Sequence, residues 1–489
     1  MRREEKKRGL LFLLPFSLFP LPSLAQTTPI QPKTPDIAIP PPIAVPTFGQ
    51  ALAPLTEDEV VRLALRLQPT VEDARGALES ASGRARQQAS NFGPTLAVTG
   101  SLSRSDSLSG SGGGVSSSSS SGSGNGGMGS TGGTGTGGTT TGNASSFQTG
   151  SNGLFSSGRL ALGVTQLLFD FGRTRDLVRQ QRALAGAAGA DLTRVQLEAA
   201  LDARQRLADL AQYHRLVLVS QQTVANREAE LTLAQANLES GLYPPKDVVD
   251  AKTNLASAVA ALVTARANES LARIQLAQAI GIDPRTPLTA ADPSETVVAP
   301  VDPTGLFTTA LSERPELRQA RRTLEAAGYG VSAARKNNSP SINANASLGT
   351  SGSSDPFQSQ SSSIGLGVNW NLFDSGFTAG AIQEAKGTQR SALANYRLAQ
   401  QTVVADVGQA YVNLATAVQR VTVNEAGVAN AREGVRLAVG RYRGGVGGTF
   451  LDITTAENQL FTAEQALETA RGDAVRARAA LDRAVGRGI

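Results

Sequence analysis

Few residues in this chain have the chemistry of a catalytic or metal-binding site. The 489 residues include one histidine, His214, and no cysteine, which excludes thiolate nucleophiles, thiolate metal ligands and disulfides. The long glycine-rich run is filled with Ser and Thr and lies between expected strands, unlike a phosphate-binding loop before a helix. We therefore expect His214 to be an incidental or packing residue, and we expect no enzyme activity and no cofactor.

The remaining candidates are carboxylates, some of which are scattered along two long expected helices. The first runs from about Phe171 to Gly241 without proline and is rich in strong helix formers. At 1.5 Å per residue such a helix is on the order of 100 Å long. Apolar residues recur every seven positions, as on the contact face of a coiled coil: Leu210, Val217, Val224, Leu231 and Leu238. The scattered Asp and Glu fit the solvated face.

The same unit occurs twice. Leu168-Phe169-Asp170-Phe171-Gly172 opens the first long helix, and Leu372-Phe373-Asp374-Ser375-Gly376 opens a second one 204 residues later. The sevenfold spacing recurs in the second copy at Val407, Leu414, Val421, Val428 and Val435. Each long helix ends in a turn rich in Gly or Pro, and an expected return helix with the same spacing follows. The chain therefore contains two tandem copies of one unit.

We divide the chain accordingly. Residues 56–282 form the first repeat and residues 304–489 the second, joined by a linker over 283–303 rich in Pro and Asp. Thr56 and Glu59 fit a capping box at the start of a helix that we expect to run to about Asn91. In each repeat we predict a helix, two strands and a long helical hairpin.

The expected strands alternate apolar with small or polar residues over about ten residues each, the length of a tilted transmembrane β-strand. Leu96 and Val98 begin one such run, and Ile364, Leu366 and Val368 lie in another. The alternative is a half-buried sheet of a soluble protein. Four strands cannot close a barrel, and lipid does not tolerate an open sheet edge. A membrane sheet would therefore need several chains, two giving eight strands and three giving twelve.

The ends and insertions of the chain carry further signals. Residues 1–25 combine a charged start, an apolar run and small residues before Gln26, as in a secretory signal peptide; the alternative is a membrane anchor. Residues 26–55 are rich in proline and predict a semi-rigid tether. Residues 101–157, nearly all Gly, Ser and Thr, predict a loop without a packed core, which we expect to face the exterior.

Charge and hydropathy limit the partners. The net charge of +5 falls to about +2 once residues 1–25 are removed, since 41 basic and 39 acidic residues remain. This balance does not support nucleic-acid binding. We identify no other run of 18 or more apolar residues, so we expect any membrane crossing of the mature chain to be made by strands.

The chain resembles the TolC family of outer-membrane efflux and secretion channels. The resemblance lies in the duplicated order of its elements and in the Leu-Phe-Asp-x-Gly motif at the start of each long helix. Residues 441–453, with sequence RYRGGVGGTFLDI, are similar to the hairpin-tip motif of that family. The resemblance implies a mainly helical protein with membrane β structure: a homotrimer with a twelve-stranded barrel in outer-membrane lipid, continued by an α-helical tunnel across the periplasm. It also implies a passive exit duct for efflux or type I secretion, docked onto a periplasmic membrane-fusion adaptor and an inner-membrane pump of the proton-driven or ABC type.

The resemblance also implies candidate site residues. Asp452 matches a carboxylate position that narrows the periplasmic end of the pore, whereas the companion position is Thr455; the first copy has Asp247 and Asp250. A basic residue that latches the gate in the family is replaced by Gly448. Alternatively, Asp452 only caps the return helix. The candidate contacts for the adaptor are the turn residues Gly241, Leu242, Tyr243, Gly445, Val446 and Gly447.

Two other functions are alternatives to a channel. A periplasmic adaptor also has a long helical hairpin, but normally one per chain beside soluble β domains. A structural adhesin would place the coiled coils outside the cell and would form no channel.

Overall fold

The computed structural model describes residues 54–105, 155–239, 244–289, 298, 303–352, 359–444 and 448–488, all within the unit Ala51–Ile489. The expected signal peptide, nearly all of the proline-rich segment, most of the glycine-rich loop and much of the linker lie outside the described residues. Six of the proposed site residues, 241–243 and 445–447, also lie outside them.

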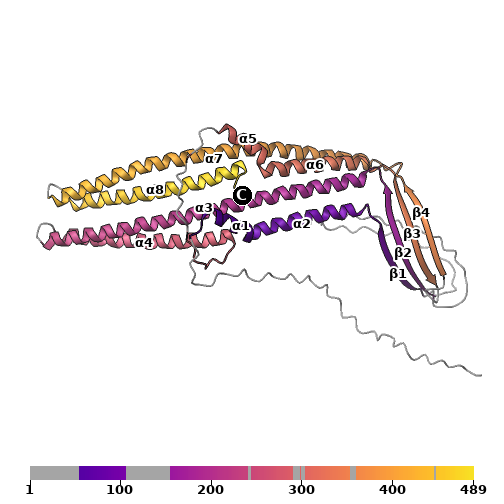
Figure 1. Ribbon diagram of the computed structural model, residues 1–489, viewed down its shortest axis with the longest axis horizontal. Coiled ribbons are helices and arrows are strands. Elements are labelled where there is room, and N and C mark those ends of the chain that lie inside the picture. The colour runs from indigo at the N-terminus through magenta and orange to yellow at the C-terminus, as the bar shows by residue number, and fades with distance from the viewer. Residues whose placement is uncertain are drawn as a thin grey trace, which may run out of the picture. The chain divides into compact units, whose positions relative to one another are not determined.

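The elements follow the duplicated order expected from the sequence (Figure 1). The first set is α1 (Glu57–Leu67), α2 (Pro69–Ser90), β1 (Thr95–Ser105), β2 (Phe155–Phe169), α3 (Arg173–Glu239) and α4 (Pro245–Ile280). The second set is α5 (Thr304–Glu313), α6 (Pro315–Arg335), β3 (Ser341–Gly352), β4 (Ser359–Asn369), α7 (Phe377–Arg443) and α8 (Phe450–Val485). The long helices α3 and α7 have the same length of 67 residues.

The first helix of each set is broken at a proline. We expected one helix from Thr56 to about Asn91, but α1 ends at Leu67 and α2 begins at Pro69. Gln68 between them is extended, with ψ 124°, because the proline ring disfavours helical geometry in the residue before it. Arg314 and Pro315 make the same break between α5 and α6. The expected capping box of Thr56 and Glu59 is present.

The Leu-Phe-Asp-x-Gly motif forms the turn from strand to long helix in both copies. The Asp170 carboxylate accepts hydrogen bonds from the backbone N–H of Gly172 (3.0 Å) and Thr174 (2.6 Å). Asp374 does the same for Gly376 (3.2 Å) and Thr378 (2.9 Å). These carboxylates satisfy free donors at the helix start. The glycines have φ of 82° and 90°, a left-handed backbone that glycine adopts without steric cost.

The four strands form one antiparallel sheet in the order β1-β2-β3-β4. Residue pairs such as Val98 with Leu162 and Ala344 with Leu366 place the apolar side chains on one face. No described helix packs on the sheet, which lies beyond one end of the helices (Figure 1). Its apolar face is therefore uncovered within one chain: Leu96, Val98, Leu348, Ile364, Leu366 and Val368 are all exposed.

The opposite face of the sheet is polar and small. It carries hydroxyl and amide side chains from all four strands: Thr95, Thr99, Thr165, Asn343, Asn345, Ser347, Ser361, Ser363 and Asn369. A soluble half-buried sheet buries its apolar face and exposes its polar one. Here the apolar face is exposed in the part of the chain that the structure describes.

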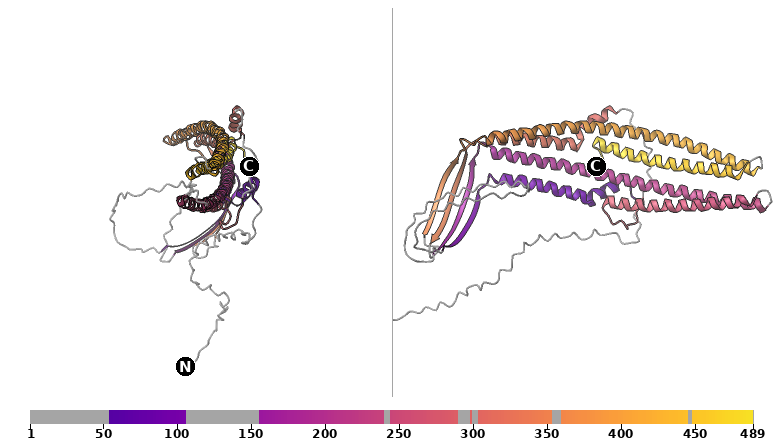
Figure 2. Two further views of the ribbon diagram at one scale, coloured as in Figure 1. Left: turned by 90° about the vertical axis from the view of Figure 1, so that its left-hand side faces the viewer. Right: turned by 180° about the vertical axis from the view of Figure 1, so that it is seen from behind.

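The long helices form two antiparallel hairpins, α3 with α4 and α7 with α8, whose tips lie at the end away from the sheet (Figures 1 and 2). Leu210 and Val217 of the expected sevenfold series are buried, as are Val407 and Leu414 in the second copy. Between Val217 and Ala234, however, the buried residues of α3 are polar: Ser220, Thr223, Arg227 and Glu230. The apolar series was therefore an incomplete guide to the face that packs.

One described helix, α4, is long and apolar enough to cross a membrane by length and composition. Polar and charged residues interrupt α4, so it contains no unbroken run of 18 apolar residues; it meets the test because its mean hydropathy is high over one stretch with few charges. This helix nevertheless packs along α3 as half of a hairpin, which is a sufficient reason for its apolar composition. Several of its apolar residues are exposed in the single chain, among them Val249, Val259, Val263, Leu271 and Ile274.

The two hairpins meet along α3 and α8, and much of this contact is polar. Arg476 on α8 binds Asp209 on α3 at 2.5 Å, and Arg215 on α3 binds Glu468 on α8 at 3.4 Å. Gly472 approaches α3 so closely that a Cβ there would lie 2.1 Å from Oε1 of Gln212. The contact between hairpins thus relies on charge pairs and close backbone approach.

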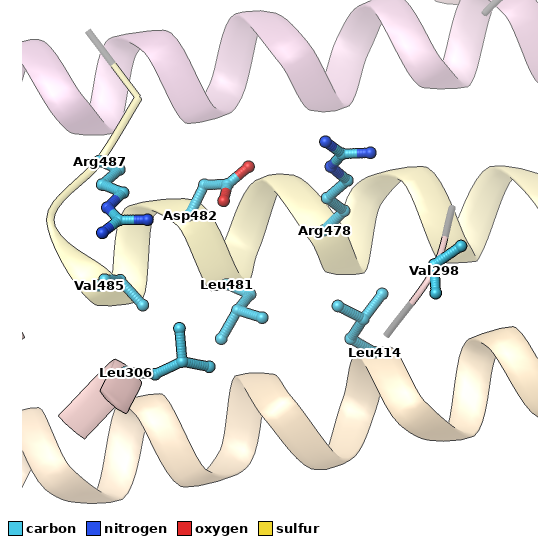
Figure 3. Close-up of a pocket in the computed structure, with 8 residues that line it drawn as sticks. All are labelled: Val298, Leu306, Leu414, Arg478, Leu481, Asp482, Val485 and Arg487. Carbon is cyan, nitrogen blue, oxygen red and sulfur yellow. The ribbon is translucent and has the colours of Figure 1, made fainter. Parts of the chain in front are cut away.

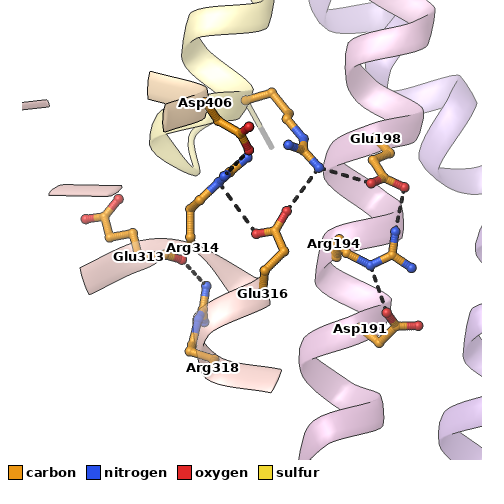
Figure 4. A network of polar contacts seen from close by, with 9 residues as sticks. Asp191, Arg194, Glu198, Glu313, Arg314, Glu316, Arg318 and Asp406 are labelled. Atoms are coloured by element: carbon orange, nitrogen blue, oxygen red, sulfur yellow. Dashed lines mark hydrogen bonds and ion pairs between the residues drawn. The ribbon is translucent and has the colours of Figure 1, made fainter. Parts of the chain in front are cut away.

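A larger charge network ties both repeats together near the middle of the long helices (Figure 4). Arg483 of α8 reaches Glu198 of α3 and Glu316 of α6, each at 3.0 Å. Arg314, which is 1% exposed, donates to Asp406 of α7 at 2.7 Å. A buried guanidinium is costly unless paired, so this network strongly constrains how α6, α7 and α8 sit together.

Candidate functional site

The candidate site lies at the hairpin tips, where α4 and α8 begin. Thr449 precedes α8 and forms a capping box with Asp452. The Asp452 Oδ2 accepts hydrogen bonds from the backbone N–H and the hydroxyl of Thr449, both at 2.9 Å, and the Asp452 N–H donates to the Thr449 hydroxyl at 3.3 Å. The capping role considered for Asp452 is therefore present in the structure.

Capping leaves the Asp452 side chain exposed and charged. The hydrogen bond from the Thr449 backbone N–H lowers the pKa of Asp452 below its usual range, and the bond from the Thr449 hydroxyl lowers it further. The charge of Arg441 makes a smaller contribution in the same direction. Both bonds from Thr449 go to a single carboxylate oxygen. The same residue can thus cap α8 and present a fixed negative charge to the solvent at the tip.

The other predicted carboxylates lie in the first turns of α4. Asp250 binds Lys246 one turn earlier, so its charge is already partnered. Asp247 accepts a hydrogen bond from the Tyr442 hydroxyl of α7 at 3.4 Å. Asp247 and Asp452 therefore stand on different return helices at the same end of the hairpins (Figure 1).

Tyr442 was missed by the sequence analysis. It is 1% exposed and packs edge-on against Phe450, with ring centroids 6.2 Å apart. Around it lies an apolar cluster drawn from all four long helices: Ala234, Ala251, Ala438, Tyr442, Phe450 and Ile453. Tyr442 lies within the tip motif of residues 441–453, six residues before Gly448, so that motif could have identified it as a candidate. This cluster holds the two tips together.

Gly448 occupies the position where the resemblance implied a basic residue. A Cβ at this position would lie 2.6 Å from the backbone nitrogen of Tyr442 and 2.8 Å from the carbonyl carbon of Arg441. Both are backbone atoms, which cannot yield without moving the end of α7. In this conformation the turn has no room for a side chain at 448, so Tyr442 with Asp247 is the link from α7 to α4.

His214 has a polar partner on the neighbouring helix. Its Nδ1 lies 3.1 Å from the Glu269 carboxylate of α4, and the ring is more than half exposed. The residue at the equivalent place in the second repeat is Val418. The pairing joins α3 to α4, and among the described residues it is not part of a group of three or more His, Cys, Asp or Glu that could hold a metal ion.

A cavity of about 390 Å³ lies between α7 and α8, near the C-terminal end of α8 (Figure 3). Leu306, Leu414, Leu481 and Val485 form its apolar side, and Arg478, Asp482 and Arg487 its charged side. Burial raises the pKa of Asp482, while the arginines oppose that change. Among the described residues no cluster of His, Cys, Asp and Glu has the arrangement of a metal site.

Comparison with known proteins identifies related chains. The profile of the family described as outer membrane efflux protein matches residues 60–282 and 306–487. The outer membrane efflux protein BepC of Brucella suis is 28% identical over 337 residues, covering 68% of this chain and 73% of BepC. The probable efflux pump outer membrane protein TtgC of Pseudomonas putida is 28% identical over 340 residues, covering 65% of this chain and 67% of TtgC.

Solved structures share the fold. VceC, an outer membrane protein of Vibrio cholerae, has a TM-score of 0.71 at 22% identity, covering 88% of this chain and 96% of that one. The open-state MtrE outer membrane channel of Neisseria gonorrhoeae has a TM-score of 0.69 at 21% identity, covering 88% and 89%. The resemblance that the sequence predicted is thereby confirmed.

Proposed function

Because this chain belongs to the outer membrane efflux protein family, we propose that three copies of it form a passive exit duct from the periplasm to the cell exterior. The protein is located in the outer membrane, with its helices in the periplasm. The family is one of transport channels and not of enzymes, and we propose that this chain likewise carries no catalytic activity.

The observation that carries the proposal is the sheet. It has four strands, two unpaired edges and an apolar face that no described residue of the chain covers. In lipid both edges must be paired, so strands from other copies must close the ring. Three copies give twelve strands, with the apolar face toward lipid and the hydroxyl and amide face toward a watery lumen.

Aromatic side chains support this placement. Phe92, Phe169, Phe171, Trp370, Phe373 and Phe377 are exposed at the junction between the strands and the long helices. Trp370 donates its indole N–H to the Asn338 carbonyl at 3.1 Å. Aromatic side chains form girdles at both interfaces of membrane β-barrels, and tryptophan favours this level because its apolar ring carries a polar N–H. The junction therefore marks the periplasmic surface of the membrane.

The helices would then continue the barrel as a periplasmic tunnel. Exposed apolar residues on α4 and α7, such as Val263 and Val423, would be covered by helices of neighbouring copies. The tips would form the inner end, where three Asp452 carboxylates, with those of Asp247 and Asp250, would surround the pore. A ring of like charge in a narrow pore attracts cations.

For partners we propose a periplasmic membrane-fusion adaptor and an inner-membrane pump, proton-driven or ABC type. Relatives are named as efflux pump outer membrane proteins, which favours efflux over type I secretion. We propose that the adaptor docks on the turn residues 241–243 and 445–447. Leu451, in the first turn of α8 and 70% exposed, adds an apolar side chain at the described part of the tip.

The lipid face can be tested with neighbouring residues on β4. Leu366→Arg places a charge on the apolar face and should prevent trimer assembly in the outer membrane, because Arg near the bilayer midplane costs about 2–4 kcal/mol in each copy. Gly365→Arg, one residue away, points to the opposite face, where a Cβ has open space, and should assemble normally. Heat-modifiable migration of membrane fractions on gels measures assembly. Equal assembly of both variants would contradict the strand assignment.

Two roles of Asp452, its negative charge at the pore end and its capping of α8, can be told apart by mutation. In Asp452→Asn the amide oxygen can still accept from Thr449, but the negative charge is lost, so the cation preference of the channel should fall. Thr455→Asp should increase it. Reversal potentials in planar bilayers under a KCl gradient measure both, with Asp58→Asn on α1 as the control. Unchanged potentials in both tip variants would leave Asp452 with the capping role alone.

Docking can be tested by photo-cross-linking in intact cells. A photoreactive residue at Leu451 should capture a periplasmic adaptor, identified by mass spectrometry, because this side chain is exposed at the tip. The control is the same probe at Leu218, exposed in the middle of α3, which should capture no adaptor. Assembled trimers that yield no adaptor from Leu451 would remove the support for docking at the tips.

A further inference from the structure

A buried group of charged residues lies between the two hairpins, on α3 and α8, close to the tips. Arg227 and Glu230 come from α3, and Glu457 comes from α8; they are 3%, 7% and 6% exposed. The amides of Asn226 and Asn458 complete the group, which we call the Glu457 cluster. Such burial of three ionisable side chains is rare unless their charges are balanced.

The charges in the Glu457 cluster are not balanced. Arg227 donates to both carboxylate oxygens of Glu230, at 3.2 and 2.9 Å. It also donates to the side-chain amide oxygen of Asn458 at 2.8 Å. Glu457 receives one long hydrogen bond, 3.5 Å from the Asn226 amide. The single guanidinium is thus committed to Glu230, and two carboxylates share one positive charge.

The surrounding helices do not supply the missing cation. On α8, Glu464 adds a second negative charge near Glu457, and it is itself bound to Arg432 of α7 at 2.9 Å. On α4, the neutral Asn254 reaches Thr454, one turn nearer the tip. From α3 the facing charged groups are Arg227 and Glu230. Within the described part of the chain, Glu457 therefore has no ion-pair partner of its own.

A carboxyl group in this setting holds its proton more strongly than in water. Burial raises the pKa of Glu457, and the nearby charge of Glu230 raises it further, while Arg227 and Asn226 oppose the change. Burial also raises the pKa of Glu230, against the lowering by Arg227. Because the Arg227 guanidinium is paired with Glu230, Glu457 is the one of the two carboxyl groups that more readily holds a proton.

We propose that Glu457 is a proton-dependent latch between the two hairpins. With a proton, it packs against α3 beside a neutralised Arg227–Glu230 pair, and the tips stay together. Without the proton, its charge faces Glu230 in a dry interface and favours separation of α3 from α8, which widens the periplasmic end. This inference rests on the proposed channel function and adds a regulator to it.

The direction of the pH dependence follows from the raised pKa. When the hairpins separate, water reaches Glu457 and its pKa returns toward the ordinary value. Stabilisation of the packed state is therefore fully present below that ordinary value and is lost as pH rises through the raised one. Each pKa unit between the two states corresponds to about a tenfold change in the packing equilibrium per chain. The channel should open more readily at alkaline pH.

Glu457→Gln tests the latch because glutamine has the shape of the protonated acid but cannot ionise. The unmodified channel should show an open probability in planar bilayers that rises with pH through the raised pKa, by about tenfold for each pKa unit between the two states. Glu457→Gln should remain at the low level of the unmodified channel at acid pH, over the whole range. The matched control, Glu464→Gln, changes a partly exposed carboxylate on the same helix and should keep the pH response.

Infrared spectroscopy of the purified full-length protein provides a second measurement that does not need conductance. In the difference between the spectra of the unmodified protein and Glu457→Gln, a carboxylic acid carbonyl band should persist above the ordinary pKa of Glu and vanish as pH rises further; the difference removes the bands of Glu230 and Asp482, whose pKa values burial also raises. A conducting channel whose pH response survives in Glu457→Gln, or a spectrum without this band, would overturn the latch. If the protein does not conduct at all, the proposed function fails, and the infrared titration still decides whether Glu457 holds the proton.

Discussion

The structure depends on one constraint: a four-stranded sheet with an apolar face and two open edges has no stable place within a single chain. In water its apolar face would be exposed, and in lipid the unpaired N–H and C=O groups of β1 and β4 would have no partners. Pairing β4 of one copy with β1 of the next removes both problems. In the proposed trimer the barrel is a property of the assembly, and each chain supplies four of the twelve strands, one third of the ring.

The helices follow from the same requirement. In the proposed trimer each barrel segment brings its own long helices, because the Asp170 and Asp374 turns join the second strand of each pair to a long helix in the same manner. Within each hairpin the contacts are mainly apolar. Between hairpins they are largely polar, from Arg483 with Glu198 to the Glu457 cluster. Polar contacts can exchange partners with water, so the hairpins are the units that can move relative to one another.

Much of this architecture was predictable because its signals are local. The Leu-Phe-Asp-x-Gly turn, the strand alternation and the unbroken long helices each depend on residues near one another in the sequence. The break at Gln68 was missed although Pro69 marks it, because a proline is also favourable in the first turn of a helix. The suitability of α4 for a membrane span, judged by mean hydropathy, was missed because we looked for an unbroken apolar run. Polar and charged residues interrupt α4, but over one stretch they are too few to lower its mean hydropathy below the level of a candidate span.

Long-range partners were less predictable. Asp452 was found through its tip motif, whereas Tyr442, Arg227 and Glu457 depend on which helix faces them across the fold. Nothing in the sevenfold apolar spacing indicated that polar residues would occupy the buried face of α3 near its tip. The reason that glycine stands at 448, a close approach to the end of α7, is visible only with both helices in place.

The central claim is that this chain works as three copies that close one barrel. The most direct measurement is native mass spectrometry of the particle extracted from outer membranes in a mild detergent, with the full chain and no cross-linker. A mass of three chains, stable on dilution, is the result we predict. A particle of one or two chains would supply four or eight strands and would contradict the twelve-stranded duct.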